Sequence, residues 1–147
     1  MKKDLRLKNH FKSEAKSVRL NARSPHNKQR LAFNLSFVTS NRKYNFSGKH
    51  FDKSIKNKFV EKMIRLSNDD LVTILGWSKE SGIENLPDHI VKLAVNSEFV
   101  ASGRAATCLT GMWIFRLAKS GRVIGKIKGT TFYVLAIDTT FDLYQHG

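Results

Sequence analysis

The sequence has little cysteine and little proline, with one Cys (Cys108) and two Pro among 147 residues. A single cysteine excludes an internal disulfide framework, and no histidine or cysteine pair has the spacing of zinc ligands. Its longest apolar runs, such as 132–137, are far shorter than the ~20 residues needed to span a bilayer. The basic start lacks the apolar stretch of a signal peptide. These absences predict a cytoplasmic chain without a membrane segment, a bound metal or another cofactor.

Acidic residues are also few, with 12 Asp and Glu against 26 Lys and Arg, for a net charge of +14. The excess lies in residues 1–30, with a net charge of +8, and in residues 31–66, with +6, while residues 67–110 carry −3 and residues 111–147 carry +3. This imbalance predicts a polyanionic partner, most often nucleic acid, with the ribosome or an acidic protein as rivals. The alternative is a solvated charged face with a basic tail.

Apolar residues make up 41% of the chain and aromatic residues 10%, which predicts a protein that folds around a core. Residues 1–30 show only weak helical periodicity and end in a loop at Ser24-Pro25, so they are expected to form a basic, partly helical arm. No linker divides the rest. Residues 31–147 are therefore expected to form a single α+β domain.

The first half of this domain has two kinds of periodicity. Alternating apolar residues predict a strand over 31–38, followed by a short returning strand with Tyr44 and Phe46. A stripe spaced by four residues then predicts a helix, with Phe51, Ile55, Phe59 and Met63 on its buried face. The opposite face holds basic residues, which are either a solvated face or a surface that lies along phosphates: Lys53, Lys56, Lys58, Lys62 and Arg65.

The second half begins with a second helix, which Ser67 is expected to cap and which would end near Lys79. A short helix is expected after Pro87, and a loop over 97–107. Strands are predicted over 109–117, 122–128 and 131–138, with a last short strand at Leu143 and Tyr144. The predicted order is strand-helix-helix-strand-strand-strand, an antiparallel sheet with helices on one face.

Alternation along residues 122–128 places Arg122, Lys126 and Lys128 on one face of a strand. Cleavage of RNA by attack of its own 2′-hydroxyl requires a base, an acid and cations around the phosphate. Arginine contacts phosphate bidentately, and tyrosine or histidine can move protons. The candidate catalytic residues are Arg116, Arg122, Lys126, Tyr144 and His146. The candidate nucleic-acid contacts are Lys2, Lys3, Arg6, Lys8, Lys12, Lys16, Arg19, Arg23, Lys28, Arg30 and Lys128.

Each of these candidates also has a simpler interpretation. The two arginines can be surface charges or contacts to a protein partner, and lysines on exposed sheet faces are common. Tyr144 can be an apolar cap on the sheet. His146 lies two residues from the end of the sequence, where chains commonly fray. Asp138 and Asp142 more often cap turns than hold a metal ion.

Three segments, 113–117 (WIFRL), 121–127 (GRVIGKI) and 132–137 (FYVLAI), are followed by Tyr144. This pattern resembles the RelE/HigB-like toxin superfamily of toxin–antitoxin systems. The resemblance implies a RelE-like fold with an Arg/Lys/Tyr site, and a metal-independent endoribonuclease that cleaves RNA by 2′-hydroxyl attack. It also implies mRNA, free or ribosome-bound, as substrate and a cognate antitoxin as partner.

The chain departs from that superfamily in its length, its basic arm and its glycine at position 125. ParE-like gyrase poisons share the scaffold and are not nucleases. The ending at 141–147 also resembles those of uncharacterised phage and mobile-element proteins. The alternative function is therefore a non-enzymatic basic protein of phage or mobile-element origin that binds nucleic acid or inhibits a host complex.

Overall fold

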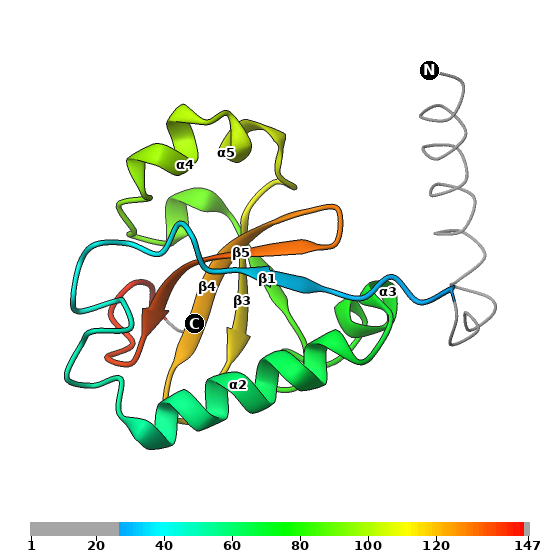
Figure 1. Cartoon of the computed structure of the whole chain (residues 1–147), viewed down its shortest axis with the longest axis horizontal. Helices are drawn as coiled ribbons and strands as arrows, with labels where there is room; N and C mark the ends of the chain where they lie inside the picture. The colour runs from blue at the N-terminus through cyan, green and yellow to red at the C-terminus, as the bar shows by residue number, and fades with distance from the viewer. Residues whose placement is uncertain (1–26, 146–147) are drawn as a thin grey trace.

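The computed structural model describes residues 27–145, so most of the predicted basic arm lies outside the described residues. Five strands form one sheet in the order β1-β5-β4-β3-β2 (Figure 1). β1 runs parallel to β5, and the other neighbours are antiparallel. Their bounds are β1 (Ala32–Asn34), β2 (Glu84–Leu86), β3 (Met112–Arg116), β4 (Arg122–Lys128) and β5 (Thr131–Asp138). The α+β class is confirmed.

The β3-β4-β5 meander follows its predicted boundaries closely. Lys128 pairs with Thr131 across a turn in which Gly129 has a φ of 58°, a conformation that glycine adopts without strain. A register shift between Ile124 and Gly125 then gives β5 one extra residue, a β-bulge. A Cβ on Gly125 would overlap the Tyr133 carbonyl oxygen, so glycine is required where the strands approach.

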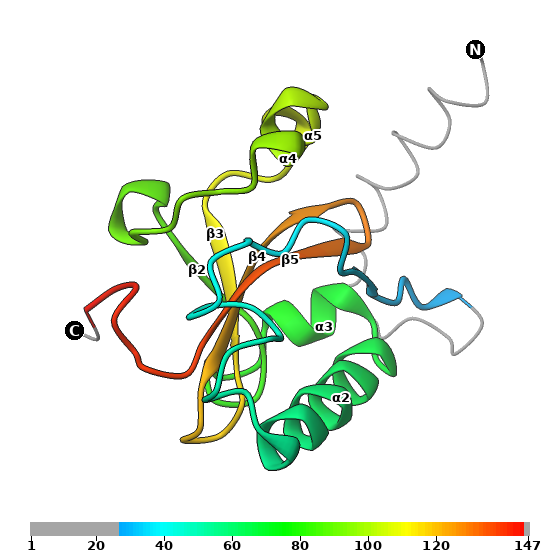
Figure 2. The same cartoon turned by 60° about the vertical axis from the view of Figure 1, so that its left-hand side comes forward.

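Helix α2 (Lys53–Ser67) forms as its apolar stripe predicts. Asp52 caps its first turn by accepting a hydrogen bond from the Ile55 amide at 3.0 Å. Phe59 packs over the sheet, with its ring parallel to Phe115 at a centroid distance of 6.3 Å. Together with α3 (Leu71–Leu75), α2 covers one face of the sheet (Figure 2).

A second layer, predicted as a short helix after Pro87 and a loop over 97–107, covers the opposite face. It contains the 3₁₀ helix η2 (Asp88–Ile90), α4 (Ser97–Ala101) and α5 (Arg104–Thr107). Phe99 of α4 is fully buried in a second core with Ile114 of β3 and Ile124 of β4. No helix within residues 27–145 is long and apolar enough to cross a membrane.

The prediction of a strand over 31–38 is wrong after Asn34. The Asn34 side chain accepts a hydrogen bond from the Ser36 amide at 2.8 Å, which turns the chain out of the sheet. As a result Leu35 is exposed, and Phe37 enters the second core. The expected strand at Tyr44 and Phe46 is also absent, because Asn41 and Asn45 form similar side-chain turns over 41–47.

Two further boundaries differ from expectation. Ser67 ends α2 and donates its hydroxyl to the Met63 carbonyl instead of capping the next helix, which begins four residues later with Asp70 as N-cap residue. Leu143 and Tyr144 do not form a strand, because the Leu143 amide donates to the side chain of Asp138 and not to a neighbouring strand.

Candidate functional site

A buried ion pair lies at one end of the β4-β5 hairpin. The register shift at Gly125 places Arg122 directly opposite Asp138. Arg122 donates to Asp138 Oδ2 from Nε at 3.2 Å and from Nη2 at 3.1 Å, and Nη2 also donates to the Tyr144 carbonyl at 2.8 Å. The exposed fractions of Arg122 and Asp138 are 1% and 0%. This pair attaches the C-terminal segment to the sheet.

Tyr144 and Arg116 complete this cluster. The Tyr144 ring centroid lies 3.4 Å from Arg122 Cζ, and its hydroxyl donates to Glu84 Oε1 at 3.2 Å. Glu84 also forms an ion pair with Arg116 Nη2 at 3.6 Å. Burial, together with the Glu84 charge, raises the pKa of Tyr144, so this hydroxyl is protonated at neutral pH. Three of the five candidate catalytic residues therefore lie together.

The other candidates lie elsewhere. Lys126 donates to Asp88 Oδ1 at 2.6 Å, and Lys128 is exposed at the end of β4. Lys28 forms an ion pair with Asp69 at 3.5 Å, and Arg30 is exposed. His146 and the arm residues Lys2, Lys3, Arg6, Lys8, Lys12, Lys16, Arg19 and Arg23 lie outside the described residues.

Beside the buried cluster is an open pocket, which we call the Arg122 pocket. Its volume is about 270 Å³, and Arg116, Ala118, Lys119, Arg122 and Phe141 line it. The Phe141 ring centroid lies 5.3 Å from Arg122 Cζ, and 43% of Phe141 is exposed. Lys119 and Phe141 were not among the predicted site residues, because both lie in turns, where residue spacing does not indicate a shared pocket.

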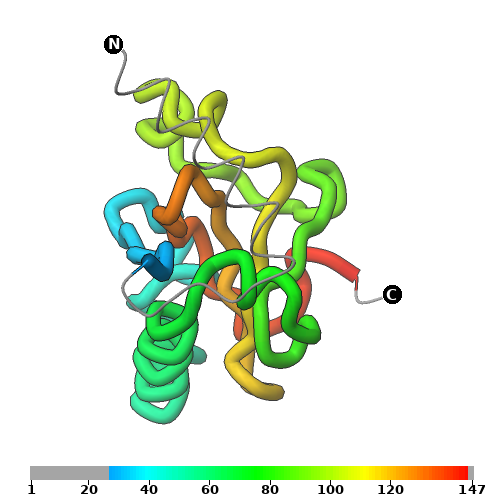
Figure 3. The backbone as a smooth tube through the Cα atoms, turned by 90° about the vertical axis from the view of Figure 1, so that its right-hand side faces the viewer, coloured from blue at the N-terminus to red at the C-terminus, as the bar shows by residue number. Residues whose placement is uncertain are grey.

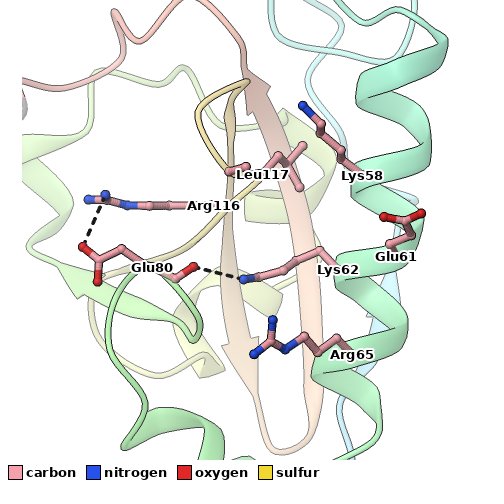
Figure 4. A pocket seen from close by; sticks show the side chains of 8 residues that line it. Lys58, Glu61, Lys62, Arg65, Glu80, Arg116 and Leu117 are labelled. Atoms are coloured by element: carbon pink, nitrogen blue, oxygen red, sulfur yellow. Dashed lines mark hydrogen bonds and ion pairs between the residues drawn. The ribbon is translucent and has the colours of Figure 1, made fainter.

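α2 and the β3–β4 turn lie at the same end of the molecule (Figure 3). A second open pocket, which we call the helix pocket, is lined by residues of both (Figure 4). Its volume is about 330 Å³. Lys58 reaches across to donate to Ser120 Oγ at 2.6 Å, and Lys62 donates to the Ser81 carbonyl at 2.9 Å. The lining residues are Lys58, Glu61, Lys62, Arg65, Glu80, Arg116, Leu117 and Ala118.

The two pockets share Arg116 and Ala118, so they form one continuous surface, which we call the basic groove. Six cationic side chains line this groove against two acidic ones, Glu61 and Glu80. Burial and the neighbouring Arg65 charge lower the pKa of Lys62. An anion bound here would relieve that repulsion. The sequence allowed the basic face of α2 to be either a solvated face or a surface that lies along phosphates. In the structure, part of this face lines the basic groove.

A separate polar network joins the 41–47 turns to the C-terminal segment. Asp142 accepts hydrogen bonds from Lys43, from the Tyr44 hydroxyl at 2.8 Å and from the Thr140 hydroxyl at 2.9 Å. These bonds, Lys43 first, lower the pKa of Asp142 to about 2. The network links two loops that are distant in sequence, and it lies outside the basic groove.

Asp142→Asn is expected to lower the stability of the protein at neutral pH, and the difference from wild type should shrink as the pH falls to 2. The folded-state pKa of Asp142 lies below that of an unfolded aspartate, so its contribution is present above about pH 4 and is lost as the pH falls towards 2. Urea unfolding measured from pH 7 to pH 2 checks this. Glu98→Gln on α4 is the control, and equal pH profiles for the two variants would contradict the assignment.

No known protein family, curated protein or solved structure matches this chain. Of the features that the resemblance to the toxin superfamily implies, the structure shows only an α+β fold with a five-stranded mixed sheet.

Proposed function

We propose that this protein binds nucleic acid along the basic groove without cleaving it. The observation that carries the proposal is the convergence of six cationic side chains from α2, β3, the β3–β4 turn and β4 on two adjoining pockets. Phosphate contacts by such side chains release counterions, and this supplies most of the affinity of non-specific binding. The net charge of +14 supports the same conclusion.

The geometry of the groove suits a flexible polyanion. Lys58 and Arg65 are seven positions apart on α2, which corresponds to about 10 Å along the helix. Arg65 also lies over the Trp77 ring, 5.7 Å from its centroid, so the ring supports its guanidinium at the groove. The groove then continues past Arg116 to Lys119 and Arg122. Such a path allows several phosphates of one strand to bind at once.

The non-enzymatic alternative is favoured over catalysis by the state of the candidate catalytic groups. Arg122 uses Nε and Nη2 on Asp138 and on the Tyr144 carbonyl, and Lys126 is paired with Asp88. Tyr144 donates its hydroxyl to Glu84. Each group is thus engaged in holding the fold, with Arg122 Nη1 alone of their donors unpaired among residues 27–145. Transition-state stabilisation requires donors directed at the developing charge.

An endoribonuclease of the toxin type is the second candidate. Its support is the proximity of Arg116, Arg122 and Tyr144 around one buried ion pair. Incubating the protein with RNA, with and without ribosomes, and mapping new 5′ ends tests it. New ends at defined positions would establish this candidate in place of the first. The cytoplasmic location, ribosome-bound mRNA and a cognate antitoxin stay predictions.

The double variant Lys58→Gln/Arg65→Gln is expected to flatten the salt dependence of RNA binding. Each lost phosphate contact removes about 0.7 from the slope of log K against log salt for a single strand, so two lost contacts should remove about 1.4. Fluorescence anisotropy with a labelled twelve-nucleotide RNA at several salt concentrations measures this slope. Lys62 is kept because its hydrogen bonds to the Glu80 and Ser81 carbonyls connect α2 to the loop before β2.

The matched control is Lys53→Gln/Lys56→Gln, which removes two exposed charges from the same helix outside the groove. Its salt slope should stay within about 0.3 of wild type, because a charge that contacts no phosphate releases no counterion. Equal losses of slope in the two double variants would show that charge alone matters, and the groove would then have no special part in binding.

A further inference from the structure

One donor in the buried cluster is not used. Arg122 Nη1 is buried and has no hydrogen-bond partner among residues 27–145. A buried charged donor without a partner costs free energy, so each such group calls for an explanation. The other two nitrogens of this guanidinium are bound to Asp138 and to the Tyr144 carbonyl, and the side chain lines the Arg122 pocket. The guanidinium therefore keeps one donor that the fold does not use, beside a pocket that the same side chain lines.

The pocket also contains unusual backbone. Ala118 (φ 51°) and Phe141 (φ 60°) are the non-glycine residues with positive φ in the part of the chain that the structure describes, and both line this pocket. Such conformations cost free energy and concentrate at functional sites. Hydrogen bonds close the turns that contain them: the Phe141 amide donates to Asp138 Oδ1 at 2.8 Å, and the amide of Leu117, next to Ala118, donates to the Gly121 carbonyl at 2.8 Å.

The backbone at Phe141 holds a large apolar ring at the surface beside a cationic pocket. With 43% of its area exposed, Phe141 gains little from burial in this position. Exposed aromatic faces next to phosphate-binding side chains are the platforms on which unpaired bases stack. Lys119, also exposed, forms no ion pair within residues 27–145, so it adds a positive charge that no acidic side chain neutralises there.

We propose that the Arg122 pocket is a nucleotide subsite, in which Lys119 and Arg122 Nη1 bind a phosphate group and Phe141 stacks against an unpaired base. This proposal rests on the proposed binding of nucleic acid and specifies its form as single-stranded. The pocket volume of about 270 Å³ lies near the lower end of the usual range of roughly 300–1,000 Å³ for ligand pockets, which favours a small ligand such as one nucleotide unit. A paired base could not offer its face to Phe141.

Titration of the full chain with adenosine 5′-monophosphate, followed by NMR, tests the subsite. The signals of Ala118, Lys119, Arg122 and Phe141 should shift and saturate together. Inorganic phosphate should shift those of Lys119 and Arg122 more weakly, and adenosine should affect mainly Phe141. Shifts confined to other residues, or no saturable shift, would overturn the proposal. If RNA binding along α2 persists in that case, the proposed function stands without this subsite.

Two exposed positions give variants that leave the buried ion pair in place. Phe141→Ala should weaken binding of adenosine 5′-monophosphate about tenfold and leave that of phosphate unchanged, since this factor lies within the range for stacking of a base on an aromatic side chain. Lys119→Gln should weaken both. Leu109→Ala and Lys92→Gln, which alter exposed residues outside the pocket, are the matched controls and should leave nucleotide binding unchanged. Nucleotide affinity that is unchanged in Phe141→Ala would refute the stacking role.

Discussion

Phe59→Ala is expected to lower the free energy of unfolding by about 3–5 kcal/mol, the range for removing a large aromatic side chain from a core. Phe59 is 3% exposed and lies at the centre of the aromatic cluster between α2 and the sheet. Its ring contacts those of Phe46, Phe51 and Phe115 at centroid distances of 5.5, 6.2 and 6.3 Å. Alanine would leave a cavity that three rings cannot close, because each of them is held by its own neighbours.

Urea unfolding followed by circular dichroism measures this loss. Val60→Ala is the control, because it removes apolar atoms from the next position of α2, where the side chain is 48% exposed. That variant should stay within about 0.5 kcal/mol of wild type, as surface substitutions usually do. A small effect of Phe59→Ala would mean that the buried stripe of α2 faces solvent or a partner and not the sheet.

Asp138→Ala should also cost about 3–5 kcal/mol, because it leaves the Arg122 charge buried without a partner. Asp138 is fully buried and accepts hydrogen bonds from Arg122 and from the Phe141 and Leu143 amides. Its removal would release the C-terminal segment as well as the guanidinium. The same reasoning applies to Arg122→Ala, so loss of activity in that variant would report unfolding and not chemistry.

The double variant Arg122→Met/Asp138→Leu tests whether the loss of stability in Asp138→Ala comes from the unpaired Arg122 charge. Replacing both charges by apolar side chains of similar volume often costs little, so the double variant should be more stable than Asp138→Ala. The two stabilities are compared by urea unfolding at pH 7. An Asp138→Ala variant that unfolds at the wild-type urea concentration would contradict the buried ion pair.

The elements that sequence predicted well are those set by local periodicity. Residues 53–67 and 122–138 have many regularly spaced apolar residues, and burial on the sheet follows that spacing. α4 and α5 were missed because five and four residues are too few to show a helical period. β1 was predicted too long because the Asn34 side chain competes with the ladder for a backbone amide, a contact that alternation does not reveal.

The candidate site was predictable only in part. Alternation along residues 122–128 grouped Arg122 with Lys126 and Lys128. In the structure Arg122 lies beside Arg116, because β3 and β4 pair at those two residues. The partner of Arg122 was not predictable, because without the bulge at Gly125 the register would place Ile137 opposite it and not Asp138. The positions of Lys119 and Phe141 depend on the geometry of two turns, which hydrophobic periodicity does not indicate.

Ultraviolet crosslinking of a single-stranded RNA to the full chain tests the central claim most directly, with peptides identified by mass spectrometry and the RNA examined for breaks. If RNA binds along the basic groove without being cleaved, the RNA should stay intact and crosslink within 58–65, within 116–122 and at Phe141, which line the groove. The basic loop at 42–50, which lines a separate pocket, should crosslink less. Cleaved RNA, or crosslinks in that loop without any in the groove, would contradict the claim.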